Sequence, residues 1–362
     1  MSTSTARQSQ VRRRPHFRLG ERDRRALDQI FSIDSRALVV LRLLMAGLIL
    51  FQALFLEMGQ FGELGGLYGG LVDNAHLVIL PFALMLLVGY KTRFATIICW
   101  LVYSLPLRAD LTNDIAVPMG HFILNLALLW CCFLPLGRHL AVDSRAENFR
   151  PVRFLSVAGG ALLFQIAVVY LSAGLVKDLG EWVFDATAME TILSLPRYET
   201  ALGVALLAYP TLLAVMSRTT FLFEVVGALL VLVPGKTLAT RRLLIMPVFV
   251  VFHVGIAALM GIGLFPYVMI ALWLLFLPSG FWDMVWARFG SARAGTELMV
   301  DDNRWRNGAA GAIVLMAFLS NVFTWLSYPD NPGTFDSYQE VMRYLLILQR
   351  WLMFNVPSMI GA

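Results

Sequence analysis

The sequence predicts an all-α membrane protein, a polytopic helical bundle of about nine spans plus one re-entrant or interfacial half-helix. Of its 362 residues, 58% are hydrophobic and only 15% are charged. A soluble domain is nearer to half apolar and a quarter charged, so this composition indicates a membrane protein. Several apolar runs approach the roughly 20 residues that a helix needs to cross a bilayer. Backbone that faces lipid must satisfy its own hydrogen bonds, which favours a helical bundle.

Charge and cysteine content exclude several other classes. The net charge is +5, and the excess lies in the N-terminal tail and a few loops. This distribution indicates membrane topology and anionic headgroups rather than nucleic acid. Cys99, Cys131 and Cys132 lie in apolar runs without metal-ligand or disulfide spacing, so they are interpreted as packing residues and no metal site is predicted. The first 35 residues are polar and arginine-rich, unlike a cleavable signal peptide.

The predicted order along the chain is a cytoplasmic basic tail (residues 1–32), a transmembrane domain (33–328) and an extracytoplasmic amphipathic tail (329–362). Basic loops near Lys91 and Arg93, at 137–153 and at 280–306 are assigned to the cytoplasm. The predicted location is therefore a multi-pass plasma (inner) membrane protein with its N-terminus inside and its C-terminus outside. The nine predicted spans cover about residues 36–56, 77–90, 94–107, 117–135, 154–176, 219–234, 243–260, 263–277 and 308–326.

One apolar segment does not fit a chain whose successive loops alternate between the two sides of the membrane. Residues 201–216 are apolar but short, and Pro210 interrupts them. Counting them as a full span would place Lys236 and the basic pair at 241–242 outside. They are therefore predicted to form the re-entrant or interfacial half-helix.

Ionisable and polar residues inside the spans are the candidate functional residues, because such residues in a membrane usually face the bundle interior. Arg42 lies too deep in the first span for a helix cap and is expected to pair with an acid or with carbonyl groups. His121 and Asn125 share one face of the fourth span. Glu224 lies in the sixth span and His253 in the seventh. Glu224 could simply pair with Arg42, and His253 could be a satisfied core histidine.

The strongest candidate is the end of the fifth span. Tyr170, Ala173, Gly174 and Lys177 share one helical face, and Trp182 follows. The small residues at 173 and 174 leave room for another helix or a flat ligand. A lysine at this position could serve as a base if water is excluded from it. The alternative is a lysine that extends to the membrane interface.

Several motifs, taken in order, resemble the HTTM domain, the membrane domain of vitamin K-dependent γ-glutamyl carboxylase and of many bacterial proteins. The resemblance runs from about Ile33 to Pro357. It rests on Ile33-Asp34 through Arg42 with Gly47, Gly89-Tyr90-Lys91-Thr92-Arg93, Phe133 to Gly137 with Val142-Asp143, Tyr170 to Trp182, Phe252-His253 with Gly261 to Tyr267, and Gln349-Arg350-Trp351 with Met353-Phe354.

The resemblance implies a specific chemistry. In the carboxylase a lysine deprotonates vitamin K hydroquinone, oxygen attacks, and the strong base so formed takes a glutamate proton before carbon dioxide adds. By this resemblance Lys177 would be the catalytic base and His253 a second catalytic residue. The cofactors would be a quinol of the vitamin K type with O₂ and CO₂. Tyr170, Glu224, His121, Asn125, Trp182 and Arg42 are expected to line the substrate or cofactor pocket.

Two functions remain open at this level. The first is a carboxylase-like enzyme that acts on a quinol or a peptide at the outer membrane face. The second is a non-enzymatic membrane partner in peptide or protein maturation or export. Fewer than about 40 residues follow the last predicted span, too few for the carboxylase's large outer domain, so its mode of propeptide binding is not expected. The expected partners are the lipid bilayer, a lipophilic small molecule and a peptide or protein substrate, with no nucleic acid. A transporter is disfavoured because no paired broken helices occur in corresponding halves.

Overall fold

The computed structural model describes most of the chain between Glu21 and Leu326. The predicted tail at 329–362, most of the loop at 57–76 and the first part of the basic tail lie outside the described residues. The described residues are 21–55, 70, 72–112, 119–144, 150–175, 177–288 and 297–326.

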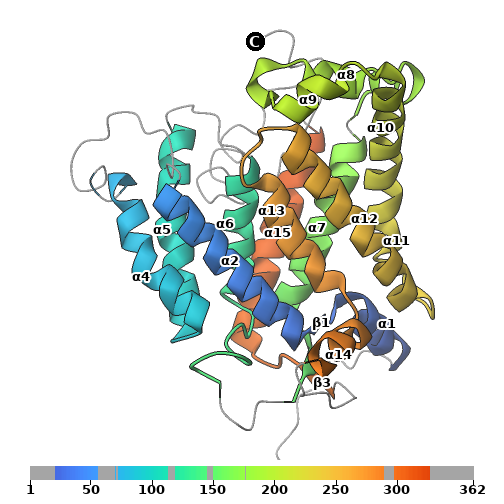
Figure 1. Ribbon diagram of the computed structural model, residues 1–362. Coiled ribbons are helices and arrows are strands. Elements are labelled where there is room, and N and C mark those ends of the chain that lie inside the picture. Colours follow the sequence, from blue (N-terminus) through green and yellow to red (C-terminus); the bar gives the residue numbers. More distant parts are fainter. Residues whose placement is uncertain are drawn as a thin grey trace, which may run out of the picture.

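Long apolar helices run side by side through the molecule (Figure 1). In the described part of the chain, four helices are long and apolar enough to cross a membrane, or five if the bent segment is counted as one span. The four are α2 (Ser35–Phe55), α7 (Val157–Leu175), the continuous helix Pro210–Leu230, and α12 (Leu238–Leu259). The bent segment joins α13 (Phe265–Trp273) and η5 (Leu274–Phe276) to α14 (Ser279–Ala287) at an angle of 99°.

The prediction of nine spans is not confirmed, although each of the nine predicted segments contains a helix. The remaining predicted spans coincide with shorter or less apolar helices, which do not meet the length and hydropathy of a crossing helix. These are α4 (Ala75–Val88), α5 (Thr92–Thr112), α6 (Met119–Cys131) and α15 (Arg304–Leu326).

The predicted half-helix is divided differently in the structure. Residues Ala201–Leu206 form the short helix α9, which lies at the end of the bundle (Figure 1). Pro210 is the first residue of a new helix, made of α10 (Pro210–Leu222), the π-helical turn η4 (Phe223–Gly227) and α11 (Ala228–Leu230). Proline is favoured at this first position because it needs no amide donor there. Pro210 therefore begins the sixth span, which was predicted to start later.

A small sheet corrects the all-α prediction. β2 (Val152–Leu155) pairs antiparallel with β1 (Ile33–Asp34) and parallel with β3 (Glu297–Val300). Phe154, predicted to begin the fifth span, lies in β2 opposite Ile33. The three strands are too short, and too far apart in the sequence, to show a strand period. The sheet joins the beginnings of α2, α7 and α15 at one end of the bundle.

Arg42 is fully buried near this same end of the bundle. One of its guanidinium nitrogens donates to the main-chain oxygens of Leu136 at 3.2 Å and His139 at 3.3 Å, and the other donates to Leu140. The expectation that Arg42 binds carbonyl groups is confirmed, and the alternative pairing with Glu224 is wrong. Through these hydrogen bonds, Arg42 holds the loop after α6 against α2.

The same loop caps α5. Asp143 accepts hydrogen bonds from the amides of Lys91 at 2.8 Å and Thr92 at 2.6 Å, and from the Thr92 hydroxyl at 2.8 Å. The preceding turn passes through Gly89 in a left-handed conformation (φ +73°), where an added Cβ would lie 2.6 Å from an Arg42 nitrogen. Three of the motifs that resemble the HTTM domain therefore meet here in a structural junction.

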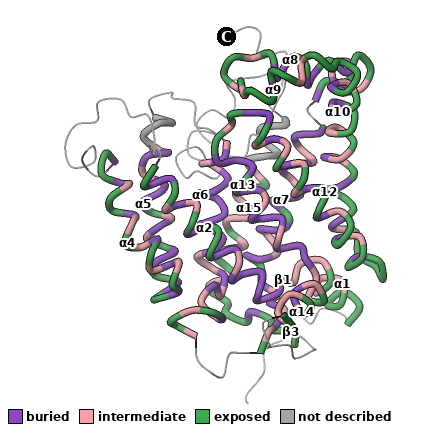
Figure 2. Tube along the Cα trace, in the orientation of Figure 1, coloured by how far each residue is buried: buried purple, intermediate pink, exposed green. Residues whose placement is uncertain are grey.

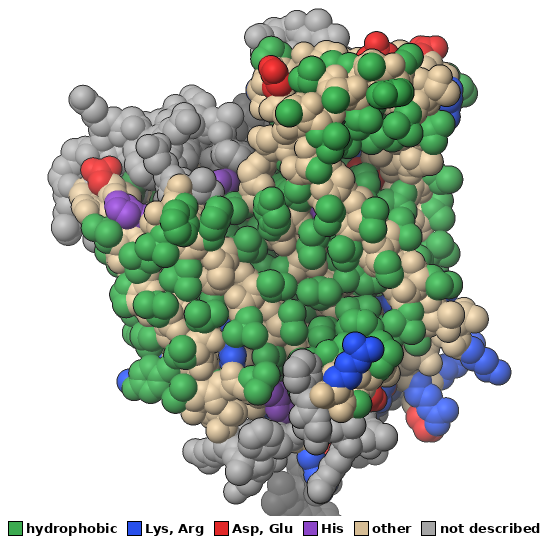
Figure 3. Space-filling model, viewed as in Figure 1, with side chains coloured by type: hydrophobic (Ala, Val, Ile, Leu, Met, Phe, Trp, Pro, Cys, Tyr) green, Lys and Arg blue, Asp and Glu red, His purple; other side chains and the backbone are tan. Residues whose placement is uncertain are grey.

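The two ends of the molecule differ in charge. Figure 2 shows a buried interior with exposed outer faces, and Figure 3 shows hydrophobic side chains covering the flank between the ends. The end that carries α1 (Glu21–Phe31) and the sheet is basic, with exposed Arg22, Arg24, Arg25 and Lys236 and a half-buried Arg241. Across the other end lie η2 (Gly180–Phe184), α8 (Ala188–Leu193), η3 (Pro196–Tyr198) and α9. An apolar flank between polar ends fits a lipid bilayer.

Candidate functional site

Lys177 lies just beyond the end of α7 and folds back into the bundle. Its side chain is 0% exposed, and its ammonium lies 2.5 Å from a carboxylate oxygen of Glu224. The ammonium also donates to the main-chain oxygen of Ala173 at 3.2 Å. It lies 4.5 Å from the ring centroid of Trp182, a cation–π distance. The alternative in which Lys177 extends to the interface is therefore wrong.

Both side chains that surround the Lys177 ammonium come from π-helical turns. Glu224 lies on η4, within the sixth span, and Trp182 lies on η2, at the end of the bundle opposite α1. A π-helical turn accommodates one extra residue, shifts the helix face, and often occurs at functional sites. Gly174 lets η4 approach α7, since a Cβ there would lie 2.5 Å from the Val225 side chain. The open face predicted at Gly174 is thus occupied by another helix.

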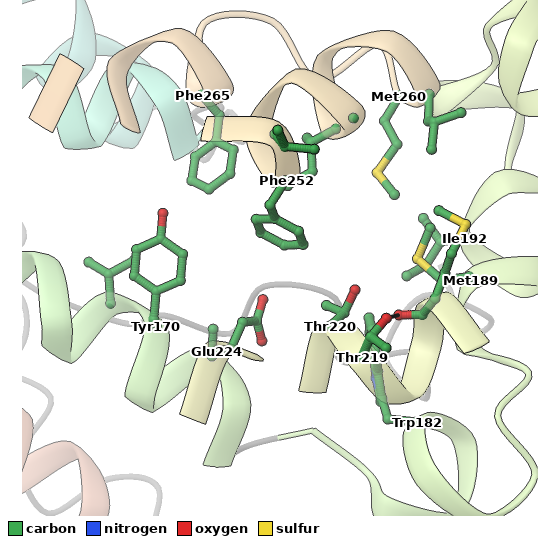
Figure 4. Close-up of a pocket in the computed structure, with 17 residues that line it drawn as sticks. Tyr170, Trp182, Met189, Ile192, Thr219, Thr220, Glu224, Phe252, Met260 and Phe265 are labelled. Carbon is green, nitrogen blue, oxygen red and sulfur yellow. Dashed lines mark hydrogen bonds between the residues drawn. The ribbon is translucent and has the colours of Figure 1, made fainter. Parts of the chain in front are cut away.

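A cavity of about 240 Å³ borders Glu224 (Figure 4). Lys177 itself does not border this cavity, so Glu224 and Trp182 stand between its ammonium and the empty space. The wall is mostly apolar, and Glu224 is its only ionisable carboxylate among the described residues. The lining residues are Val169, Tyr170, Ala173, Trp182, Met189, Ile192, Met216, Thr219, Thr220, Glu224, Val251, Phe252, Gly255, Ile256, Leu259, Met260 and Phe265.

Tyr170 connects the cavity wall to His253. The His253 Nδ1 lies 2.7 Å from the carbonyl of Phe249, which can only accept, so Nδ1 carries a proton. In the neutral ring Nε2 then accepts from the Tyr170 hydroxyl at 2.8 Å. The Trp273 indole donates to the same hydroxyl oxygen, also at 2.8 Å. These bonds fix the orientation of Tyr170, while His253 does not reach the cavity surface.

His121 lies in a separate polar cluster between α2, α5 and α6. His121 Nδ1 lies 2.9 Å from the amide nitrogen of Gln52 and 3.1 Å from the Tyr103 hydroxyl. That hydroxyl donates to the Gln52 amide oxygen at 2.6 Å. Asn125 is buried on the same helix as His121. The structure thus brings Lys177, Glu224, Tyr170, Trp182 and His253 together, but not His121, Asn125 or Arg42.

Three contributing residues were missed from the sequence. Trp273 and Phe249 complete the bonding of Tyr170 and His253, and Gln52 centres the second cluster. Gln52 was detectable as a lone amide in an apolar span. Trp273 carried no comparable signal, because an aromatic residue in an apolar helix usually indicates packing alone.

A family model for the HTTM domain matches residues 60–281, more than half of the chain. The chain belongs to the HTTM domain family. The resemblance to γ-glutamyl carboxylase is a general property of this family. In this HTTM protein the match includes Lys177, Glu224 and His253, whereas Arg42 and the motifs near 33–47 and 349–354 lie outside it. No curated protein and no solved structure matches the chain.

Proposed function

We propose that this HTTM protein is a membrane enzyme that binds a lipophilic molecule with a weakly acidic hydroxyl, of the hydroquinone class, beside Glu224. The observation that carries the proposal is a buried lysine–carboxylate pair at 2.5 Å whose carboxylate borders an apolar cavity. A buried ion pair adds little to stability compared with apolar packing, which supports a chemical role for it.

The cavity fits a ring of this kind. Small-molecule pockets commonly measure about 300–1,000 Å³, so a cavity of about 240 Å³ suits a single ring system better than a whole lipid. Phe252 and Phe265 supply apolar and aromatic walls, and Tyr170 and Glu224 supply the few polar groups. This combination of apolar walls with convergent polar groups is typical of small-molecule sites.

A long apolar tail has a route out of the cavity. Thr219 of α10 and Val251 of α12 both border the cavity and are exposed on the outer surface, Val251 by 70%. The space between these two helices therefore leads toward the lipid-facing flank. A lipophilic substrate in the bilayer would reach Glu224 by this route without passing through water.

The lysine–carboxylate pair supplies the proton chemistry. A charged ammonium has no free electron pair, so it cannot accept a proton, whereas the Glu224 carboxylate can. We propose that the ligand hydroxyl gives its proton to this carboxylate. The Lys177 ammonium, which does not border the cavity, then stabilises the oxyanion through the protonated Glu224. Lys177 becomes a base itself only after passing one of its own protons to Glu224. A bound quinol would supply the redox chemistry.

The test is to fill the cavity without disturbing the pair. Gly255 borders the cavity, and an added Cβ there would meet no atom within 4 Å. We expect a quinone or quinol to co-purify with the wild-type protein, as identified by mass spectrometry, and to be lost from Gly255→Leu. The matched control is Gly47→Leu, at a glycine of α2 that is equally open and does not border the cavity.

Lys177→Met and Glu224→Gln separate binding from chemistry. An enzyme of this kind should retain the lipophile in both variants and lose its turnover. If the wild-type protein carries no such molecule, and both variants keep their protein partners, the proposed function is wrong and the chain acts as a non-enzymatic maturation partner.

A further inference from the structure

A second pocket, of about 420 Å³, lies at the basic end of the bundle, far from the cavity beside Glu224. α1, β1, the turn before α12 and the turn before α14 contribute to it. We call it the headgroup pocket and define it by Asp28, Arg153, Lys236, Ala239, Arg242 and Ser279. The proposed function does not use it, and Asp34 is the one residue of the HTTM-like motifs that borders it.

The headgroup pocket has uncompensated positive charge. Arg153 pairs with Asp28 at 2.8 Å. Asp34, which also borders the pocket, is paired with Arg36 at 2.9 Å. In the described part of the chain, no carboxylate lies within salt-bridge distance of Arg242 or Lys236, which leaves two positive charges unpaired.

Of these two charges, that of Arg242 costs more to bury, because Arg242 is only 5% exposed. It donates to the main-chain oxygens of Val231 at 3.1 Å and Ile30 at 2.7 Å, so its hydrogen bonds are directed but its charge is not neutralised. A buried charge without a counter-ion is costly, and an anion in the pocket would remove that cost.

Two helices begin at the pocket wall. α12 begins at Leu238 and α14 at Ser279, and both residues border the pocket. Neither residue before these helices makes a side-chain capping hydrogen bond, although the Leu238 amide itself donates to the main-chain oxygen of Gly235 at 3.1 Å. Free amide groups and the helix dipole at such ends attract phosphate and other anions. The pocket therefore combines two helix N-termini with a buried guanidinium and a lysine.

Asp28 adds a preference for a ligand that carries a hydrogen-bond donor. Its Oδ1 is buried without a hydrogen-bond partner, while Oδ2 binds Arg153. An unpaired carboxylate oxygen requires a donor. A ligand that fits this pocket thus has a phosphate together with a hydroxyl or ammonium group.

Exposed leucines continue from the pocket along the bundle. Leu243 lies one turn beyond Ala239 on the same helical face and is 40% exposed, and Leu244 is 68% exposed. Apolar surface next to a phosphate site favours a molecule with acyl chains over a free phosphate.

We propose that the headgroup pocket binds the phosphodiester of an anionic glycerophospholipid, such as phosphatidylglycerol, from the leaflet at the α1 end. The phosphate lies between Lys236, Arg242 and the two helix N-termini. A headgroup hydroxyl donates to Asp28. The acyl chains lie along the leucines of α12.

The experiment uses full-length protein in nanodiscs with equal amounts of phosphatidylglycerol and phosphatidylcholine, followed by native mass spectrometry of the retained lipid. A basic residue near an anionic headgroup contributes about 1 kcal/mol, or roughly a fivefold change in binding. We expect wild type to retain phosphatidylglycerol preferentially, and Lys236→Gln to reduce this retention about fivefold.

Ala239→Glu is the second variant. Ala239 is exposed at the first turn of α12, where an acidic side chain stabilises a helix, so the variant should fold while its carboxylate repels phosphate. The control is Arg241→Gln, which removes one positive charge, as Lys236→Gln does, at the residue next to Arg242. Arg241 binds the carbonyls of Leu230 and Val233 and does not border the pocket.

The outcomes are distinct. Loss of retained lipid in Lys236→Gln and Ala239→Glu, but not in Arg241→Gln, supports the proposal. Equal retention in all three variants overturns it. So does displacement of the lipid by millimolar inorganic phosphate or glycerol 1-phosphate, which would show that the pocket takes a soluble phosphate.

Discussion

Lys177 has its ammonium enclosed by one carboxylate, one carbonyl oxygen and one indole ring. These contacts account for its burial, since each offsets part of the cost of removing the charge from water. They also explain why Glu224, rather than Lys177, borders the cavity. The residue that was predicted to act directly on a ligand therefore lies behind its partner.

The pair can be tested by a double-mutant cycle. Removing one member of a buried pair leaves the other uncompensated and typically costs about 3–5 kcal/mol. We expect Lys177→Met and Glu224→Gln each to destabilise the protein by roughly this amount, and the double variant to cost less than their sum. Unfolding in mild detergent measures both quantities. The exposed pair Arg25–Glu21 of α1 is the control, and its removal should cause no measurable change. If the destabilising effects of the two substitutions were additive, Lys177 and Glu224 would not be energetically coupled, and the prediction would be wrong.

His139, which lies outside the membrane-spanning helices, is expected to make the stability of the folded protein depend on pH. Burial, followed by the charge of Arg138, lowers the pKa of His139 to about 4. Its Nε2 lies 2.9 Å from the Ser35 hydroxyl, whose oxygen also accepts from the Val152 amide at 3.0 Å.

Since the unfolded chain binds this proton near pH 6.5 and the folded chain does not, the full stability is present above pH 6.5. It is lost as pH falls toward 4. Between pH 7 and pH 5 we expect the wild type to lose about 2 kcal/mol more than His139→Gln. The measurement is thermal unfolding of both proteins at both pH values. The titration of the carboxyl groups affects both proteins equally, so it drops out of the difference between them. Parallel losses would contradict the prediction.

Individual helices were well predicted from the sequence, because apolar runs with polar ends are a local signal. All nine predicted segments contain helix. The sheet was not predicted, because β1, β2 and β3 are brief and are paired only by the fold. The π-helical turns at Glu224 and Trp182 were also missed, because nothing in the local composition distinguishes such a turn from regular helix. The half-helix error at Pro210 came from treating this residue as a helix breaker, when proline also begins helices.

The α5 cap gives a prediction for one element. Asp143 provides three hydrogen bonds at the beginning of α5, and these bonds, working against its burial, lower the pKa of its carboxyl group. Loss of such a cap costs about 0.5–2 kcal/mol. We expect Asp143→Ala to destabilise the protein by an amount in this range in thermal unfolding. Asp302→Ala removes an exposed carboxylate near β3 and serves as the control. An equal effect of the two substitutions would show that charge, not capping, matters.

For the whole molecule, the membrane orientation follows from the charge difference between the ends. The basic α1 end should face the cytoplasm. We expect a cysteine in place of Lys236 to react with a membrane-impermeant maleimide only in broken cells, and one in place of Glu190 of α8 to react in intact cells. Cys99 and Cys131 are buried and give little background, while the half-buried Cys132 can be replaced by serine. The reverse labelling pattern would invert the topology.

The extra residue in η4 has a consequence for comparing relatives. Its insertion rotates the helix before it by about 100° relative to the helix after it. A homologue with a regular helix at this place would be one residue shorter there, and the position aligned with Glu224 without a gap would point elsewhere. Deleting one residue of Phe223–Gly227 other than Glu224 should therefore uncouple the acid from Lys177 while leaving the Glu224 and Lys177 side chains chemically intact.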